Sequence, residues 1–458
     1  MVEDGTVTEL RLAQRQRPEQ RLDETVKTVN VALLRRTYLD AEFRGGLERL
    51  IHSGGENAFY ETVFADTVSC GRHELGAVDC ADLRWYEVDS PADLVRADYV
   101  FGTPEQRLAF LDGQHGGYWR HGVVDHRMLD NPWFPPAAMT AAMAAEFPDA
   151  MRHYPPGQAA FGALLAAVVG QPVERLVVAN GASELIKVLG PLLGRVVLTV
   201  PNFNEYEQVL SGGTARRFEL VAPGFALDPD ELLDAAGPGI DAVIVTSPNN
   251  PTSQLVPRED LLHLAKELRD VGARLLVDES FIDFSGQAAS VAEDVTDHPN
   301  LVVIKSMSKA YGVGGIRLGY LATADLDFAA AVRAELPIWN LNGIAESFLR
   351  LLPHHAADFA ESLRQVRAAT AQLYDGLCAL GLTCCPPEGN FVLVRLPDPW
   401  TGAAAALALF EHHSLLVKHC AGKSMTDGER YLRLASRTAS DNDRLVAALA
   451  AILEQGPS

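Results

Sequence analysis

Cysteines are sparse in this chain of 458 residues, and long apolar runs are missing from it. The six cysteines form no C-x-x-C pair, the spacing that many zinc sites use, so we expect no metal site. So few cysteines in a chain of this length favour a reducing compartment. No run of about eighteen apolar residues occurs, and we therefore expect no transmembrane helix.

Basic residues are also in deficit. Lysine and arginine number 39 against 60 aspartates and glutamates, which gives a formal net charge of −21. A polyanionic nucleic acid is therefore not expected as a partner. The first twenty residues are charged and lack the apolar core of a secretory signal, so we expect a cytoplasmic protein.

What the chain does contain is a series of short apolar runs that alternate with helical patterns. Continuous runs rich in Val, Ile and Leu are typical of strands buried on both faces, as in a mostly parallel sheet. The runs predict a large α/β domain. They are RLVVAN (175–180), RVVLTV (195–200), DAVIVTS (241–247), ARLLVDE (273–279), LVVIKS (301–306) and IRLGYLA (316–322).

The chain is long enough for several domains. The composition predicts a flexible N-terminus, a small mixed unit, an arm rich in Gly, Pro and aromatic residues, the large domain, and a smaller α+β domain with one strand pattern, NFVLVRL (390–396). The predicted segments are 1–27, 28–108, 109–150, 151–340 and 341–458, in that order.

Chemically distinctive residues follow the apolar runs. In parallel α/β sheets, ligands bind beyond the carboxyl ends of the strands. A small-residue turn that opens a helix is a ready anion site. The candidates, in chain order, are Gly181-Ala182-Ser183, Asn250, Asp278, Ser306, Ser308, Lys309 and Arg317.

Together these residues match the requirements of pyridoxal 5′-phosphate (PLP). A lysine amine forms a Schiff base with the cofactor aldehyde, which we assign to Lys309. A carboxylate keeps the pyridine nitrogen protonated, as we expect of Asp278. The amide of Asn250 can donate to the ring oxygen. A helix N-terminus and the Arg317 guanidinium can hold the phosphate.

Four motifs then identify a family resemblance. SMSKAYGVGGIRLGY (306–320), TSPNNPT (246–252), LLVDESFIDF (275–284) and VANGASELI (178–186) resemble class I/II aminotransferases of PLP fold type I. The similar subgroups are histidinol-phosphate aminotransferase and threonine-phosphate decarboxylase. The resemblance covers about 110–458.

The resemblance implies further site residues. Tyr206 would stack on the cofactor ring, and Tyr154 would reach the phosphate in the neighbouring subunit of a homodimer. Arg433 would bind the substrate α-carboxylate, and Asn390 would lie near it. Arg437 stands where aminotransferases usually have a small residue, so it could bind a phosphate, a phosphonate or a second carboxylate, or form a structural ion pair.

Another departure is Phe281, which replaces the tyrosine that usually donates to the ring oxygen in this family. Threonine-phosphate decarboxylases look similar at this place. The GKS triplet at 422–424 lacks the upstream glycine of a phosphate-binding loop, so we do not expect such a loop here.

The unit at 28–108 resembles the end of a sugar-type nucleotidyltransferase domain, as found in fusions of phosphonate metabolism. The matching segments are ERLIHSGGENAFYETVF (48–64) and LRWYEVDSPADL (83–94). Glu87 and Asp89 would lie near the metal of an intact domain. Because the nucleotide-binding front half is missing from this resemblance, we expect a structural or dimer-forming role.

The leading hypothesis is transamination of an amino acid or of a phosphorylated or phosphonate relative. Decarboxylation is an alternative, motivated by Phe281 and Arg437. Elimination or replacement is another, for example on S-adenosylmethionine with a nucleotide-bearing partner. A non-catalytic protein of the same fold is the last alternative. The first three share the same site residues, so the sequence does not separate them.

Overall fold

The chain divides into two compact units, Met1–Phe110 and Leu111–Ser458, which are described separately. The computed structural model describes residues 2–10, 28, 31–71, 73–80, 82–212, 215–286 and 288–456.

The first unit is mostly helical, with Phe43, Val63 and Phe64 at its centre. Of the segment predicted to be flexible, 11–27 lies outside the described residues, whereas residues 2–10 include a hairpin of β1 and β2. Its elements are β1 (Val2–Glu3), β2 (Thr6–Val7), α1 (Arg36–Tyr38), α2 (Arg44–His52), α3 (Glu61–Ser69) and α4 (Pro91–Phe101); α5 (Pro104–Gln114) crosses into the second unit.

The second unit is built around a mixed sheet that has seven strands among the described residues, in the order β4-β10-β9-β8-β7-β5-β6. Only β10 runs antiparallel to its neighbours. The strands are β4 (Leu176–Ala179), β5 (Val196–Val200), β6 (Ala215–Glu219), β7 (Ala242–Thr246), β8 (Arg274–Asp278), β9 (Leu301–Ser306) and β10 (Gly319–Thr323).

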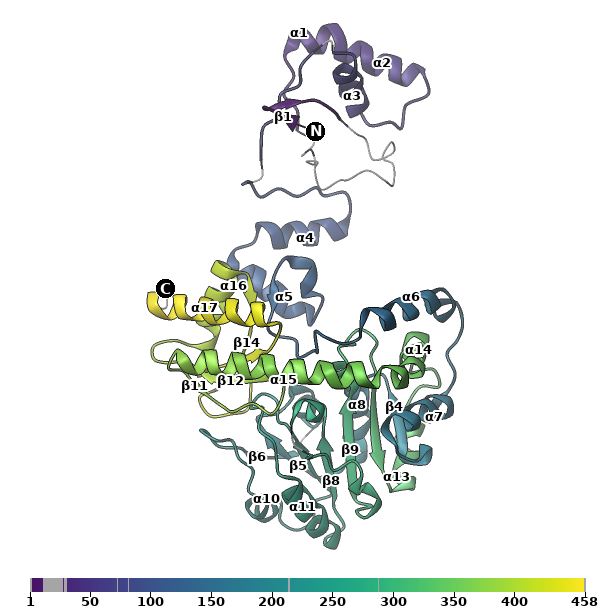
Figure 1. Cartoon of the computed structure of the whole chain (residues 1–458), viewed down its shortest axis with the longest axis vertical. Helices are drawn as coiled ribbons and strands as arrows, with labels where there is room; N and C mark the ends of the chain where they lie inside the picture. The colour runs from purple at the N-terminus through teal and green to yellow at the C-terminus, as the bar shows by residue number, and fades with distance from the viewer. Residues whose placement is uncertain are drawn as a thin grey trace. The chain divides into compact units, whose positions relative to one another are not determined.

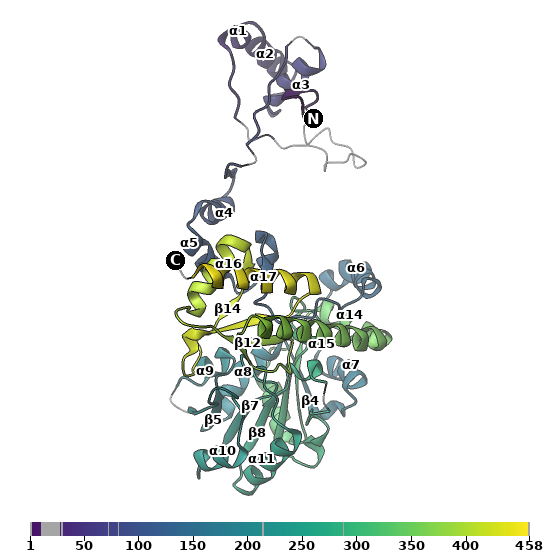
Figure 2. The ribbon, with the colours of Figure 1, turned by 60° about the vertical axis from the view of Figure 1, so that its left-hand side comes forward.

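Both faces of this sheet are buried, which explains the continuous apolar runs. Along β7, Ala242 and Ile244 pack with α8 and α13, whereas Val243 and Val245 pack with α10 and α11 on the opposite face. Figure 1 shows these helices around the sheet, and Figure 2 shows α8, α10 and α11 from another side. They are α8 (Ala182–Leu192), α10 (Pro229–Ala236), α11 (Arg258–Asp270) and α13 (Leu326–Glu335).

The six strands predicted from apolar runs are all present, and the predicted α/β fold is confirmed. The prediction missed β6, whose sequence is ARRFE. This strand lies at the sheet edge and is partly exposed, so charged side chains can occupy it without an apolar pattern.

The C-terminal part forms the second, smaller α+β domain. The predicted strand is β12, but the sheet contains further short strands and has the order β11-β12-β15-β14. Two of these span only two residues, too short for a sequence pattern. The elements are β11 (Thr383–Cys384), β12 (Phe391–Arg395), β14 (Lys418–His419), β15 (Tyr431–Ala435), α16 (Gly402–His413) and α17 (Ala439–Gln455).

The predicted arm begins and ends in a helix, and the mainly irregular stretch between them, 115–136, contains β3 (Val124–Asp125), which pairs in parallel with β13 (Leu415–Leu416) of the small domain. The remaining helices are α6 (Ala137–Arg152), α7 (Gln158–Val169), α9 (Asn204–Val209), α12 (Met307–Ala310), α14 (Gly343–Leu351) and α15 (Ala356–Ala379).

The long helix α15 connects the large and small domains. It contacts α17 and β12 of the small domain and the 3-10 turn Ile282–Phe284 after β8 (Figure 1). Over the described residues, none of the helices has the length and apolarity needed to cross a bilayer.

Candidate active site

Asp278 is the last residue of β8, and its buried carboxylate is held by two donors. Tyr206 Oη donates to Asp278 Oδ2 at 2.8 Å, and the Ser280 backbone N–H donates to Oδ1 at 3.0 Å. Burial raises the pKa of Asp278, while these hydrogen bonds favour the charged form. Two residues that were predicted separately, Asp278 and Tyr206, are thus in direct contact.

Lys309 lies in α12, which begins immediately after β9. The Ser306 hydroxyl caps this short helix by accepting from the Ser308 N–H at 3.3 Å. Burial lowers the pKa of Lys309 to about 8, and the positive charges of Arg433 and Arg317 act in the same direction. The amine is therefore much more often neutral at physiological pH than that of an ordinary lysine.

Three segments bring hydrogen-bonding groups together at the start of α8. Arg317 Nη2 donates to Ser183 Oγ at 3.2 Å, and Nη1 donates to Ser308 Oγ at 3.3 Å. The helix cap Gly181 has φ +79, and a Cβ there would lie 2.4 Å from Arg317 Nη2. Only glycine fits at this position, beside a cation and a helix N-terminus that both attract anions.

Asn250 follows β7 and contacts the small domain. Arg433 Nη1 donates to Asn250 Oδ1 at 2.9 Å, which leaves the Asn250 Nδ2 group as a donor. Arg433 Nη2 donates to the backbone oxygen of Arg127. Burial lowers the pKa of Arg433 to about 10. Among the described residues, Arg433 forms no ion pair with a carboxylate, and its buried Nε lacks a partner.

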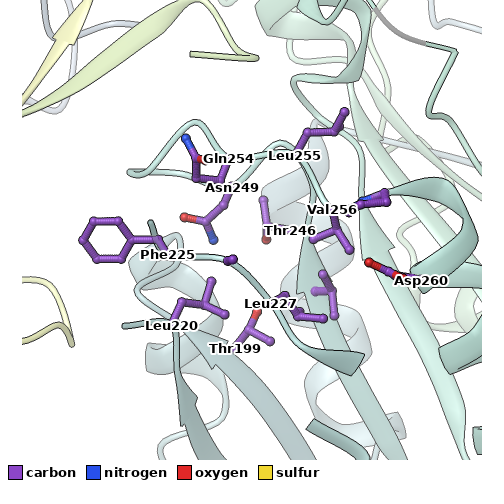
Figure 3. A pocket seen from close by; sticks show the side chains of 13 residues that line it. Thr199, Leu220, Phe225, Leu227, Thr246, Asn249, Gln254, Leu255, Val256 and Asp260 are labelled. Atoms are coloured by element: carbon purple, nitrogen blue, oxygen red, sulfur yellow. The ribbon is translucent and has the colours of Figure 1, made fainter. Parts of the chain in front are cut away.

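The two asparagines of the TSPNNPT motif have different environments. Asn249 Nδ2 donates to the Pro201 oxygen at 3.0 Å, and its Oδ1 accepts from Thr252, so Asn249 holds the turn. It also lines a cavity of about 310 Å³, which Figure 3 shows with Thr199 and Thr246. None of the predicted site residues lines this cavity.

Asn390 is fully buried just before β12. Its Nδ2 donates to the backbone oxygen of Asp130 at 3.4 Å. Its Oδ1 has no partner among the described residues and is therefore available to accept a hydrogen bond from a ligand.

Two further predicted residues have partners of their own. Arg437 Nη1 donates to the Asp125 backbone oxygen at 3.0 Å, and its Nε lies 3.6 Å from Asp441 Oδ2. Tyr154 is 80% exposed and packs on Trp339, with ring centroids 4.7 Å apart. Its predicted role needs a second copy of the chain.

Phe281 packs in the core against Phe391, with ring centroids 5.1 Å apart. In the first unit, Asp89 donates its backbone N–H to Asp93 Oδ2 at 3.3 Å. The part of the chain that the structure describes contains no group of three or more His, Cys, Asp or Glu side chains arranged to hold a metal ion.

Several charged groups around the site were missed from the sequence. Asp130 and Arg127 come from the arm, and Lys418 and Lys423 come from the small domain. Asp130 raises the pKa of Lys309, and Arg433 and Lys418 both lower that of Lys423. These residues are far apart along the chain and form no common motif. The only sequence pattern that includes one of them is the GKS triplet at 422–424, which contains Lys423.

Comparison with known proteins gives a family match over most of the second unit. The family model "Aminotransferase class I and II" matches residues 126–449. The solved structure of histidinol-phosphate aminotransferase from Clostridium acetobutylicum is similar with a TM-score of 0.67 and 23% identity, over 73% of this chain and 100% of that one. At this identity, the likeness shows the fold alone.

Two curated relatives extend this picture. CMP-5′-(3-aminopropyl)phosphonate synthase of Streptomyces rubellomurinus is 43% identical over 93% of this chain and 68% of its own length. Threonine-phosphate decarboxylase of Salmonella typhimurium is 30% identical over 76% of this chain and 98% of its own. The chain spans only about two thirds of the first two curated relatives it matches, 68% and 65% of their lengths.

Proposed function

Because this chain belongs to the aminotransferase class I and II family, we propose that it is a PLP enzyme in which Lys309 carries the cofactor. The observation that supports this role best is the lowered pKa of Lys309, about 8, beside the held carboxylate of Asp278. A neutral amine is the form that attacks an aldehyde. The family match also sets aside the non-catalytic alternative.

The residues present fit each part of the cofactor. Arg317, Ser183 and the N-terminus of α8 would hold the phosphate, beside a glycine that leaves room for it. Asp278 would pair with the ring nitrogen, and Asn250 Nδ2 would donate to the ring oxygen. Phe281 contributes no hydroxyl, so the ring oxygen has one donor fewer than is usual in this family.

PLP supplies an aldehyde for covalent attachment and a ring that accepts electrons. The chain supplies the rest. Lys309 Nζ takes up and returns protons, which suits an amine with a pKa of about 8. Tyr206 and Ser280 keep the Asp278 carboxylate in place. Arg433 offers Nε and its guanidinium plane to a substrate anion.

For the reaction, we propose decarboxylation of an α-amino acid that carries a phosphate or phosphonate. In this reaction the bond from Cα to the carboxylate breaks, CO₂ leaves, and a proton takes its place. The support is the name of the 43% identical relative, whose aminopropyl product is an amine without a carboxylate, together with the similar threonine-phosphate decarboxylase. Transamination remains the second candidate, favoured by the family match itself.

Product analysis with the purified holoenzyme separates the two reactions. L-2-Amino-4-phosphonobutyrate is the carboxylated precursor of 3-aminopropylphosphonate, so we expect CO₂ and that amine. A keto acid with conversion of the cofactor to its amine form would establish transamination instead. Lys309→Ala should lack the absorption band of the attached cofactor, whereas the exposed Lys266→Ala should keep it. A band that persists in Lys309→Ala would disprove the assignment.

We also propose that the enzyme is a homodimer in which Tyr154 reaches the cofactor phosphate of the partner subunit. The support is the exposure of Tyr154 and of its neighbour Trp339, which is 53% exposed. Light scattering should give twice the chain mass of 49.6 kDa. A monomer that retains full activity would contradict this proposal.

A further inference from the structure

Cationic side chains gather beside Arg433, and the carboxylates of Asp112 and Asp125 act against their mutual repulsion. Lys418 and Arg433 are direct cross-strand partners on β14 and β15, so their side chains leave the same face of the sheet. Like charges placed directly opposite each other destabilise a sheet. Among the described residues, neither side chain forms an ion pair with a carboxylate. Such an arrangement favours a ligand that brings negative charge.

Lys423 adds a third cation at the same place. It lies in the loop after β14, and its Nζ donates to the backbone oxygen of Asn202 at 2.5 Å. Asn202 is fully buried beyond the end of β5, and its side chain accepts from Thr246 Oγ1 at the end of β7. Lys423 therefore reaches from the small domain to the carboxyl edge of the large sheet. The residue that it contacts there, Asn202, precedes Tyr206 by four positions.

The surroundings of Lys423 hold its charge poorly. Burial lowers the pKa of Lys423 to about 7; Arg433 and Lys418 act in the same direction, while Cys420 and Glu207 oppose it. Glu207 is already engaged, since its Oε2 lies 3.0 Å from Arg217 Nε and accepts from Ser424 Oγ at 2.6 Å. The partner of the Lys423 ammonium is thus a neutral carbonyl.

The number of cations exceeds what one amino-acid carboxylate neutralises. Arg433 alone can bind that carboxylate in a two-pronged manner. Lys418 and Lys423 then remain, with ammonium donors suited to a compact anion that has several oxygens. We propose that Lys423 binds a second anionic group of the substrate, a phosphonate or phosphate, and thereby determines substrate preference. This inference rests on the proposed function, whose substrate class it makes specific.

Two probes with the same amino-acid head test this assignment. One is the methyl monoester of L-2-amino-4-phosphonobutyrate. Its phosphonate group keeps a single negative charge over the pH range of the binding measurements, about 5 to 9. The other is L-2-aminobutyrate, which lacks the phosphonate. Each is titrated into the holoenzyme, and the change in cofactor absorption gives its dissociation constant. The ratio of the two dissociation constants measures the preference for the phosphonate group, because effects on the shared amino-acid head cancel.

We expect the wild type to prefer the monoester, and Lys423→Met to lose about 30-fold of that preference, as for one charge-assisted hydrogen bond. In the wild type the preference should be constant below pH 7, fall about tenfold per pH unit above it, and level off once the about 30-fold contribution of the ammonium form is lost. Lys423→Arg should keep the preference at all these pH values. Lys266→Met, at an exposed lysine paired with Glu267, is the matched control.

The outcomes are distinguishable. If aminobutyrate changes the absorption but the monoester binds no more tightly, or Lys423→Met keeps the preference, the assignment of Lys423 is wrong and the proposed function stands. If neither probe perturbs the cofactor of the wild type, both are overturned. Rescue of the preference by Lys423→Arg excludes a merely structural role for the lysine.

Discussion

The environment of Lys309 predicts how fast the protein without cofactor attaches PLP at different pH values. With a pKa of about 8 instead of 10.5, about one quarter of Lys309 is neutral at pH 7.5, compared with about one thousandth of an ordinary lysine. Since the neutral amine is the nucleophile, the attachment rate should rise about tenfold per pH unit up to pH 8 and then level off.

Removing the neighbouring charges, one positive and one negative, should move the pH midpoint of the attachment rate in opposite directions. Arg433→Gln removes the strongest repulsion, so the midpoint should rise; a rise of about one pH unit would correspond to about 1.4 kcal/mol of repulsion. Asp130→Asn removes an attraction and should lower the midpoint. Arg395→Gln, at a residue paired with Asp427, should leave it unchanged.

The assay is stopped-flow absorbance after mixing PLP with each protein from which the cofactor has been removed. The ionisations of free PLP are common to all the proteins, so the differences between them report Lys309. A wild-type midpoint near 10, or a shift in the same direction for Arg433→Gln and Asp130→Asn, would refute the electrostatic reasoning.

Two further predictions concern the cofactor pocket and its support. Arg317→Ala should weaken PLP binding about 100-fold in equilibrium dialysis, because it removes the charged donor fork from the phosphate pocket; unchanged binding would place the phosphate elsewhere. Gly312→Ala should lower the free energy of unfolding by about 2 kcal/mol in calorimetry, because its Cβ would lie 2.0 Å from the Phe134 oxygen at φ +60. Gly314→Ala, with open space around it, is the control, and equal effects would contradict the steric explanation.

The large domain was predictable because its strands are buried on both faces and end in chemically distinctive residues. Asp278, Asn250 and Lys309 each follow an apolar run, and the ends of parallel strands meet at one sheet edge. The edge strand β6 escaped prediction because its charged residues face solvent. β14 escaped because two residues carry no period.

The charged half of the site was less predictable for a related reason. Arg433 could be named only through the family resemblance, and Lys418 lies beside it through an antiparallel pairing that no local pattern encodes. The sequence left Arg437 open between binding a second anion and forming a structural ion pair, and its Nε lies 3.6 Å from Asp441 Oδ2. Lys423 is not predictable from its triplet, which lacks a phosphate-loop context, because only the fold brings it to Asn202 beyond the end of β5.

The division of the site between two sheets explains how one cofactor chemistry could serve different substrates. The groups that fit the cofactor, namely Lys309, Asp278 and Arg317, all lie on the large domain. The cations available to a substrate, Arg433 and Lys423, come from the small domain and reach the large sheet through Asn250 and Asn202. Changes in the small-domain cations should therefore alter substrate preference while the cofactor stays bound, whereas changes in the large-domain groups should release the cofactor for every substrate alike.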